Sequence, residues 1–271
     1  MILLDGAFGT SLWKKAGERG IEKVPTWRYN IEHPELIREL VSEYKEAGSE
    51  IIQANTFSAN CFSLKGTGYE VSEVIKAGVR CTKEALSGTG VKTFLSCGPL
   101  PVMIEPYGDT EESEAADCYR EIFEAAVTEA PDIITLETFM DLNMLRIALC
   151  EAKKTGLPVF CTMTFEKSLR TVMGNTIEDI CRVLSDGGAD AVGMNCSLGP
   201  DEAFPVIKRF SECTSLPLIY KPNAGLPGDS SFDKKGFADS VMPAVQYVSY
   251  LGGCCGTDPA YIKELAARCR H

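Results

Sequence analysis

The residues most suited to chemistry are three cysteines: Cys196 and the adjacent pair Cys254 and Cys255. Three thiolates suit zinc, and three protein ligands leave one tetrahedral position open, which is typical of a catalytic zinc site. The pair lies in the segment 252–257, Gly-Gly-Cys-Cys-Gly-Thr, whose glycines permit the bend that turns both sulfurs towards one centre. The cysteines alone therefore indicate a metal site, but they also allow a strained disulfide between the neighbours or simple burial.

Two carboxylates, those of Asp5 and Glu137, each follow an apolar run. Two carboxylates that face one cavity would bind a cation well. The backbone N–H groups of Gly6, Ala7 and Phe8 could hold an anion such as a substrate carboxylate. Ordinary structural roles are the alternative, because Asp-Gly is frequent in turns and the residues after the second carboxylate could cap a helix.

The chain alternates between short β-rich runs and segments with helical periodicity. Eight runs begin near Ile2, Glu50, Lys92, Asp132, Pro158, Ala189, Pro217 and Tyr247. Between them apolar residues recur at helical spacing, as from Leu36 to Tyr44. Eight such units predict an α/β fold, a single (βα)8 TIM barrel over residues 1–271. A doubly wound open sheet is the alternative, although no Gly-x-Gly-x-x-Gly follows the first run.

A barrel of this kind predicts where the chemistry takes place. Active sites of (βα)8 barrels lie at the C-terminal ends of the strands. The three cysteines and both carboxylates fall at such ends, and only one strand separates the sixth run from the eighth. We therefore expect the cysteines to converge. Asn55, Asn195 and Asn223 also stand at strand ends and are further candidates for shaping a substrate site.

Composition restricts the partners. The net charge is −11 and basic runs are absent, which argues against nucleic acid and against an anionic membrane surface. No apolar run approaches the roughly 20 residues of a membrane helix, and residues 1–4 lack the basic region of a targeting segment. We therefore expect a soluble, cytoplasmic protein. The chain has only two histidines, and this scarcity argues against His-based triads and against zinc fingers with Cys and His ligands.

The remaining cysteines favour a reduced, structural role. The chain has 12 cysteines, but a disulfide framework is typical of short secreted proteins rather than of a long chain such as this one. Five of them occur within helical patterns, where we expect small buried apolar residues. These five are Cys81, Cys118, Cys150, Cys181 and Cys269.

Six segments together resemble the homocysteine S-methyltransferase family, in the family's order. They read Asp-Gly-Ala-Phe-Gly-Thr at 5–10, Asn-Thr-Phe at 55–57, Leu-Glu-Thr-Phe at 136–139, Met-Asn-Cys-Ser-Leu-Gly-Pro at 194–200, Pro-Asn-Ala-Gly-Leu-Pro at 222–227 and Gly-Gly-Cys-Cys-Gly-Thr at 252–257. The resemblance implies a (βα)8 barrel in which Cys196, Cys254 and Cys255 bind zinc. It also implies that Asp5 and Glu137 approach the substrate ammonium group.

The resemblance implies a reaction as well. The thiol of homocysteine would enter the open zinc position as a thiolate and attack a methyl group, forming methionine. Segments 98–99, 105–109, 163–166 and 170–174 resemble the first module of cobalamin-dependent methionine synthase. The cobalamin signature Asp-x-His-x-x-Gly is absent, so methylcobalamin would arrive on a separate corrinoid protein.

Several alternatives stay open on sequence grounds. The same zinc chemistry could act on another small thiol, or use S-methylmethionine or betaine as the methyl donor. A hypothesis of another class is a non-catalytic barrel that only docks a corrinoid protein. An unrelated barrel lyase would need a Schiff-base lysine, for which Lys221 is the one candidate at a strand end.

Overall fold

The strands form one parallel sheet that curls into a barrel. The computed structural model describes residues 1–225 and 232–269. The sheet has eight strands in the order β1-β8-β7-β6-β5-β4-β3-β2. The backbone N–H of Glu50 donates to the carbonyl of Leu3 over 2.7 Å and so joins the two ends of the sheet. The predicted (βα)8 barrel is confirmed, and the open doubly wound sheet is excluded.

Seven of the eight strands begin within two residues of the predicted positions. The strands are β1 (Ile2–Leu3), β2 (Ile51–Gln53), β3 (Lys92–Cys97), β4 (Ile133–Phe139), β5 (Val159–Met163), β6 (Ala191–Asn195), β7 (Leu218–Lys221) and β8 (Tyr250–Leu251). The prediction for the last strand was wrong by three residues. Met242–Tyr247 form the 3₁₀ helix η2, and β8 begins only at Tyr250.

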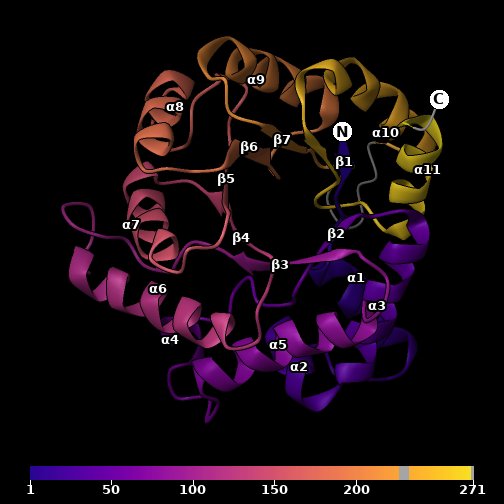
Figure 1. The fold of residues 1–271 in the computed structure, drawn as a ribbon, viewed down its shortest axis with the longest axis vertical. Coiled ribbons are helices and arrows are strands. Elements are labelled where there is room, and N and C mark those ends of the chain that lie inside the picture. Colours follow the sequence, from indigo (N-terminus) through magenta and orange to yellow (C-terminus); the bar gives the residue numbers. More distant parts are fainter. Residues whose placement is uncertain (226–231, 270–271) are drawn as a thin grey trace.

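Helices surround the strands as an outer ring (Figure 1). They are α1 (Gly9–Glu18), η1 (Thr26–Arg28), α2 (Tyr29–Glu32), α3 (Pro34–Ala47), α4 (Cys61–Leu64), α5 (Val71–Ala85), α6 (Glu112–Val127), α7 (Leu142–Lys153), α8 (Ile177–Asp186), α9 (Pro200–Cys213), α10 (Lys234–Val241) and α11 (Pro259–Cys269). Side chains at helix starts fix several of them, because Asp141 and Thr176 accept hydrogen bonds from the first-turn N–H groups of α7 and α8. Within the described ranges, no helix combines the length and the apolar character that crossing a membrane requires.

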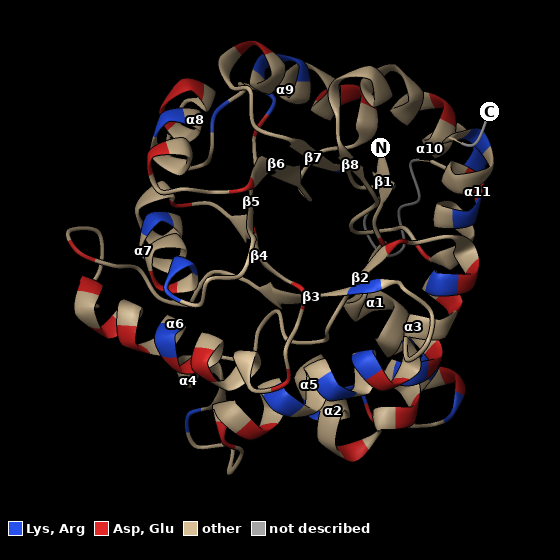
Figure 2. Cartoon of the chain, viewed as in Figure 1, with Lys and Arg blue, Asp and Glu red and all other residues tan. Residues whose placement is uncertain are grey.

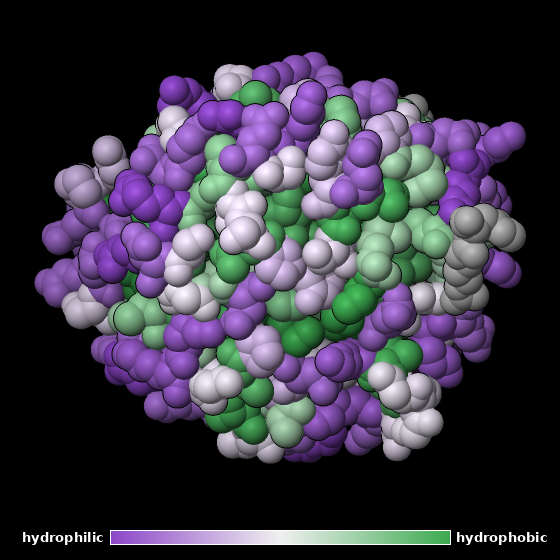
Figure 3. Space-filling model, turned by 45° about the horizontal axis from the view of Figure 1, so that its top comes forward, coloured by the Kyte–Doolittle hydropathy of each residue, from purple (hydrophilic) through white to green (hydrophobic). Residues whose placement is uncertain are grey.

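Charged residues lie mainly in the outer layer of helices. Figure 2 shows Lys, Arg, Asp and Glu mainly on the outer helices, with few on the inner ring of strands. The face drawn in Figure 3 likewise has hydrophilic residues around its margin and hydrophobic ones gathered towards the middle. The few charged side chains inside the barrel are therefore exceptional, since a buried charge is costly unless it is paired.

Period-two alternation along the strands separates two apolar cores. One core fills the inside of the barrel and consists of Leu4, Ile51, Phe94, Ile133, Phe160, Ala191 and Ile219, with Ile2 and Tyr250 packed against it. Their sequence neighbours point the other way: Ile52, Leu95, Ile134, Cys161, Val192 and Tyr220 pack in the larger core beneath the helices. Each strand is thus apolar on both faces, as expected for a sheet that is buried on both sides.

A buried polar layer replaces the inner apolar core near the C-terminal ends of the strands. Two or four residues beyond an inner apolar residue, the same strand carries a polar side chain on the same face. This polar layer consists of Gln53, Ser96, Glu137, Thr162, Asn195 and Lys221, all of them buried. It forms the floor on which the candidate site is built.

Candidate active site

A cavity of about 300 Å³ lies at the C-terminal ends of the strands. Its wall includes the three cysteines, the segment 6–10, Asn55, Glu137, Asn195 and Lys221. The loops after β1, β2, β6 and β8 therefore meet there, as the barrel hypothesis requires. Asp5 and Asn223 are not part of this wall.

The three cysteines converge at one side of the cavity. The sulfurs of Cys196, Cys254 and Cys255 all lie within 4.8 Å of one another. Backbone hydrogen bonds to the end of β7 hold both cysteine loops: Cys196 N–H donates to the Lys221 carbonyl over 3.0 Å, and Cys254 N–H to the Pro222 carbonyl over 2.9 Å. Three soft sulfur donors at this spacing fit a metal ion that accepts three thiolates.

Backbone conformation lets these sulfurs meet. Cys196 has a φ of 62° and Gly256 a φ of 81°, both in the left-handed region. A Cβ atom on Gly256 would lie 2.5 Å from the Gly225 carbonyl oxygen, so only glycine fits where these two loops touch. Gly256 is therefore required both by its positive φ and by the close approach of the two loops; the predicted role of the flanking glycines in turning both sulfurs to one centre stays a prediction.

Protons are shared unequally among the three sulfurs. Hydrogen bonds from Cys254 and Cys255 lower the pKa of the Cys196 thiol to about 3. The same bonds to Cys196 raise the pKa of Cys255 to about 11 and that of Cys254 well above its ordinary value. Near neutral pH the cluster therefore holds one thiolate and two thiols. A metal ion that displaced the two protons would meet three thiolates.

Asn195 ties the cysteine cluster to β4 and β5. Its Oδ1 accepts from the Thr138 N–H over 2.8 Å and from the Thr162 hydroxyl over 2.7 Å. Its Nδ2 donates to the Thr138 hydroxyl over 2.7 Å and to Cys254 Sγ over 3.8 Å. Protein groups thus fill the hydrogen-bonding capacity of this amide. Asn195 therefore supports Cys254 from β4 and β5, and its contact with a substrate stays a prediction.

The other two asparagines differ in position. Asn55 lies on the cavity wall, and its Nδ2 donates over 2.7 Å to the carbonyl of Thr26 and over 2.7 Å to Oδ1 of Asn30. It thereby anchors the segment around η1 at the rim. Asn223 is buried, its N–H donates to the Leu198 carbonyl over 2.9 Å, and its Oδ1 has no partner among residues 1–225 and 232–269. The segment 222–227 extends beyond the described residues.

The two predicted carboxylates occupy different environments. Asp5 is fully buried behind the wall; Oδ1 accepts from Lys221 Nζ over 3.0 Å and Oδ2 from the Gln53 N–H over 2.8 Å. Glu137 lies on the wall, where Oε1 accepts from the Ser96 hydroxyl and Oε2 is 3.8 Å from Lys221 Nζ. Burial raises the pKa of Glu137, while the charge of Lys221 opposes this.

Lys221, which the sequence offered only as a Schiff-base candidate, lies beside both carboxylates, 3.0 Å from Asp5 Oδ1 and 3.8 Å from Glu137 Oε2. Burial lowers its pKa, but the charges of Asp5 and Glu137 outweigh burial and raise the pKa above its ordinary value. A lysine that stays protonated is a poor Schiff-base nucleophile, which weakens the lyase alternative. Alternation along β7 puts Lys221 on the same face as Ile219, a signal that could have placed its side chain inside the barrel.

The segment 6–10 brings a helix N-terminus to the cavity. Helix α1 begins at Gly9, and in the described part of the chain the N–H groups of Phe8, Gly9 and Thr10 have no protein acceptor. Free N–H groups at the start of a helix can bind an anion. The Ala7 N–H is already engaged, because it donates to Thr257 Oγ1 over 3.1 Å. Of the predicted backbone donors, Phe8 thus has a free N–H and Ala7 does not.

Three of the five helical cysteines are buried as predicted. Cys81, Cys118 and Cys181 are buried and Cys269 is half-buried. Cys150 is exposed, so the prediction that it is buried was wrong. Apolar residues of α7 occupy much of its circumference, and the sequence therefore does not distinguish its inner from its outer face.

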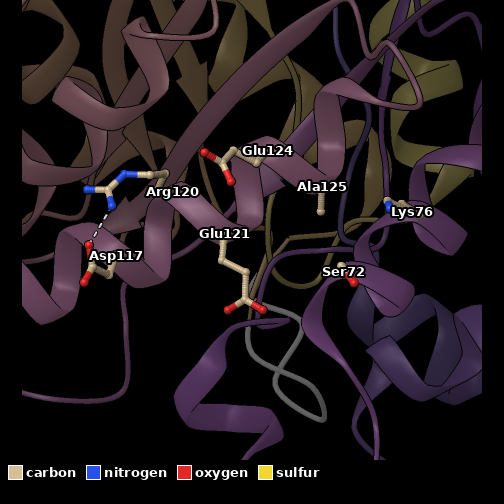
Figure 4. Close-up of a pocket in the computed structure, with 7 residues that line it drawn as sticks. All are labelled: Ser72, Lys76, Asp117, Arg120, Glu121, Glu124 and Ala125. Carbon is tan, nitrogen blue, oxygen red and sulfur yellow. Dashed lines mark hydrogen bonds and ion pairs between the residues drawn. The ribbon is translucent and has the colours of Figure 1, made fainter.

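A second hollow lies between α5 and α6, away from the cysteines (Figure 4). It is lined mainly by charged side chains, and Arg120 forms an ion pair with Asp117 over 2.7 Å. No cysteine lines it, and the three predicted ligands belong to the cavity at the barrel mouth. The barrel mouth is therefore the candidate active site.

The sequence matches a known family over nearly its whole length. Residues 2–269 match the model of the family described as homocysteine S-methyltransferase. Methionine synthase of Mycobacterium tuberculosis (strain ATCC 25618 / H37Rv) is 29% identical over 97% of this chain and 24% of its own length. Methionine synthase of Mycobacterium leprae (strain TN) is 27% identical with the same coverage. The chain therefore spans about a quarter of the length of these curated relatives.

A solved structure shows the same fold. The metallated form of the homocysteine methyltransferase MmuM from Escherichia coli superposes with a TM-score of 0.81 at 21% identity. The match covers 99% of this chain and 96% of that one. Because the family model covers nearly the whole sequence, this protein belongs to the homocysteine S-methyltransferase family.

Proposed function

We propose that the protein transfers a methyl group to the thiolate of homocysteine, forming methionine, with zinc bound by Cys196, Cys254 and Cys255. One observation carries the proposal: three sulfurs within 4.8 Å of one another form part of a cavity wall that also contains Glu137 and the start of α1. A thiol with an amino-acid end needs these three kinds of group together.

The cysteines supply the donors for the metal. A zinc ion held by three thiolates would lower the pKa of a thiol bound in its fourth position and so favour the nucleophilic thiolate. The chain's own residues orient this centre. Asn195 donates to Cys254 Sγ, and the Thr257 hydroxyl donates to the Cys254 carbonyl over 2.7 Å. Both contacts fix the sulfur relative to the cavity.

The amino-acid end of the substrate would bind away from the cysteines. Glu137 presents its carboxylate to the cavity and would pair with the substrate ammonium group. The free N–H groups at the start of α1 would hold the substrate carboxylate. Homocysteine carries both groups, whereas a simple alkyl thiol carries neither. This supports homocysteine over a thiol without an amino-acid end.

We further propose that the methyl donor is methylcobalamin on a separate corrinoid protein that docks at the barrel mouth. Large apolar side chains are exposed on the loops after β2, β3, β4 and β5. They are Phe57, Met103, Tyr107, Met140 and Val172. Phe57 also lines the cavity, so this apolar rim adjoins the proposed substrate site. Large exposed apolar side chains beside a binding cavity are consistent with an interaction surface.

A panel of methyl donors tests the proposal. Purified zinc-loaded protein is incubated with homocysteine and, in turn, methylcobalamin, a methylated corrinoid protein, S-methylmethionine and betaine. Methionine is then quantified by mass spectrometry. We expect methionine with a corrinoid donor, and a loss of activity in Cys254→Ser but not in the exposed-cysteine control Cys150→Ser. Methionine from S-methylmethionine or betaine alone would reassign the donor. Binding of the corrinoid protein without turnover of any thiol would support the docking hypothesis instead.

A further inference from the structure

Lys221 occupies the place between the two carboxylates that the family resemblance assigns to the substrate. It is 3% exposed, and its Nζ lies 3.0 Å from Asp5 Oδ1 and 3.8 Å from Glu137 Oε2. We propose that Lys221 is a specificity-determining residue: it pairs with Asp5 and leaves Glu137 as the single carboxylate for the ammonium group of an aminothiol. This inference rests on the proposed function and refines its substrate-binding end.

The contacts of Asp5 support this division. Both of its carboxylate oxygens have protein partners, Lys221 Nζ and the Gln53 N–H. Its side chain is fully buried and lies outside the cavity wall. A substrate ammonium group could reach this carboxylate only by displacing Lys221. Asp5 therefore acts on the substrate through the lysine.

Glu137 has the opposite arrangement. It belongs to the cavity wall, and the Ser96 hydroxyl engages only Oε1. The 3.8 Å from Oε2 to Lys221 Nζ is longer than a hydrogen bond. Oε2 therefore keeps room for a further donor, which a substrate ammonium group would supply. The cavity offers one carboxylate oxygen, not two carboxylates.

Charge balance gives the arrangement its selectivity. Two buried carboxylates without a cation would repel each other and resist ionisation. One lysine leaves a single net negative charge, which matches one ammonium group. On the side of the barrel interior, Lys221 Nζ lies 5.3 Å from the centroid of the Phe94 ring, and this ring belongs to the inner apolar core. A thiol without an amino group would leave Glu137 buried and uncompensated.

Binding measurements on four variants test the inference without any methyl donor. The variants are Asp5→Asn, Lys221→Met, the double variant Asp5→Asn/Lys221→Met, and the exposed-lysine control Lys208→Met. Calorimetry on zinc-loaded protein compares L-homocysteine, 4-mercaptobutanoate without the ammonium group, and 3-aminopropanethiol without the carboxylate. Thermal unfolding and zinc content verify that each variant is folded and metallated.

We expect Asp5→Asn to free Lys221 to pair with Glu137, and so to weaken binding of L-homocysteine and 3-aminopropanethiol about tenfold. Binding of 4-mercaptobutanoate should change less than about threefold. The double variant removes a matched charge pair and should restore homocysteine binding to within about threefold of wild type. Lys208→Met should resemble wild type.

Two outcomes would overturn the inference. If the double variant binds homocysteine as weakly as Asp5→Asn, then Asp5 itself contacts the ammonium group. If Lys221→Met weakens both carboxylate-bearing thiols and spares 3-aminopropanethiol, then Lys221 binds the substrate carboxylate. If Lys221→Met does not fold, the comparison of homocysteine binding by Asp5→Asn and by the double variant still tests the inference. If the variants bind the three thiols as expected but wild type forms no methionine, only the proposed function is refuted.

Discussion

Cys196 Sγ lies 3.4 Å from Cys255 Sγ, although 59 residues separate the two cysteines in sequence. They extend from the ends of β6 and β8, and both loops are hydrogen-bonded to the end of β7. The closed strand order therefore creates the cluster, since neighbouring parallel strands end at the same edge. At this distance the two sulfurs can share a proton or bind the same metal ion.

Zinc binding should release protons. Near neutral pH the metal-free cluster keeps protons on Cys254 and Cys255, because the pKa of Cys255 is about 11 and that of Cys254 is raised well above its ordinary value. We therefore expect about two protons released per zinc ion, and zinc affinity that rises with pH. Titration of apo protein with zinc in weakly buffered solution at pH 7 measures this number. Release of fewer than about one proton would contradict the assigned protonation.

Asn195→Ala should weaken the metal site without removing a ligand. The substitution deletes the contact to Cys254 Sγ and leaves the Thr138 N–H without its acceptor. Loss of such a supporting contact typically costs about 10- to 100-fold in metal affinity. Competition with a chromogenic chelator gives the dissociation constant. The matched control is Asn143→Ala, a half-buried residue of α7 outside the cavity wall. Equal affinity in the two variants would show that Asn195 does not position the cysteine.

Gly256→Ala should destabilise the fold through a specific collision. A Cβ atom there would meet the Gly225 carbonyl oxygen at 2.5 Å, in addition to the cost of a φ of 81°. Gly66→Ala has a similar φ of 76° but nothing within 4 Å, so it isolates the cost of the backbone conformation. We expect Gly256→Ala to lose about 1–3 kcal/mol more unfolding free energy than Gly66→Ala, measured by urea denaturation. Equal losses would mean that the loops can separate freely.

Glu137 should give substrate binding an acid limb. Burial raises its pKa above the ordinary value of 4.5, and only the ionised carboxylate pairs with an ammonium group. As pH falls through the raised pKa, homocysteine affinity should therefore decline at a higher pH than an exposed glutamate would give. The ratio of KM for homocysteine to KM for 4-mercaptobutanoate isolates this effect, because both thiols share the sulfur chemistry. Glu137→Gln should abolish the pH dependence of the ratio; persistence of that dependence would assign it to another group.

The sequence was sufficient to predict the barrel, because eight apolar runs alternate with helical patterns. The last strand was misplaced, because the apolar run near Tyr247 suits either a strand or a short helix, and η2 ends there. The proximity of the cysteines followed from strand order alone. The ion pair between Lys221 and Asp5 could not be predicted from strand order, because it joins strand ends 216 residues apart across the barrel interior. Periodicity indicates which face a side chain occupies but not its partner on that face.

Zinc-dependent methionine formation tests the central claim most directly. Zinc is removed from wild type and Cys150→Ser with a chelator, then restored in steps, while methionine formation from homocysteine and the active donor is measured. Cys254→Ser is assayed in parallel. We expect activity in the first two proteins to return in proportion to bound zinc and to saturate at about one ion per chain, with Cys254→Ser inactive. Full activity without zinc, or in Cys254→Ser, would contradict the account.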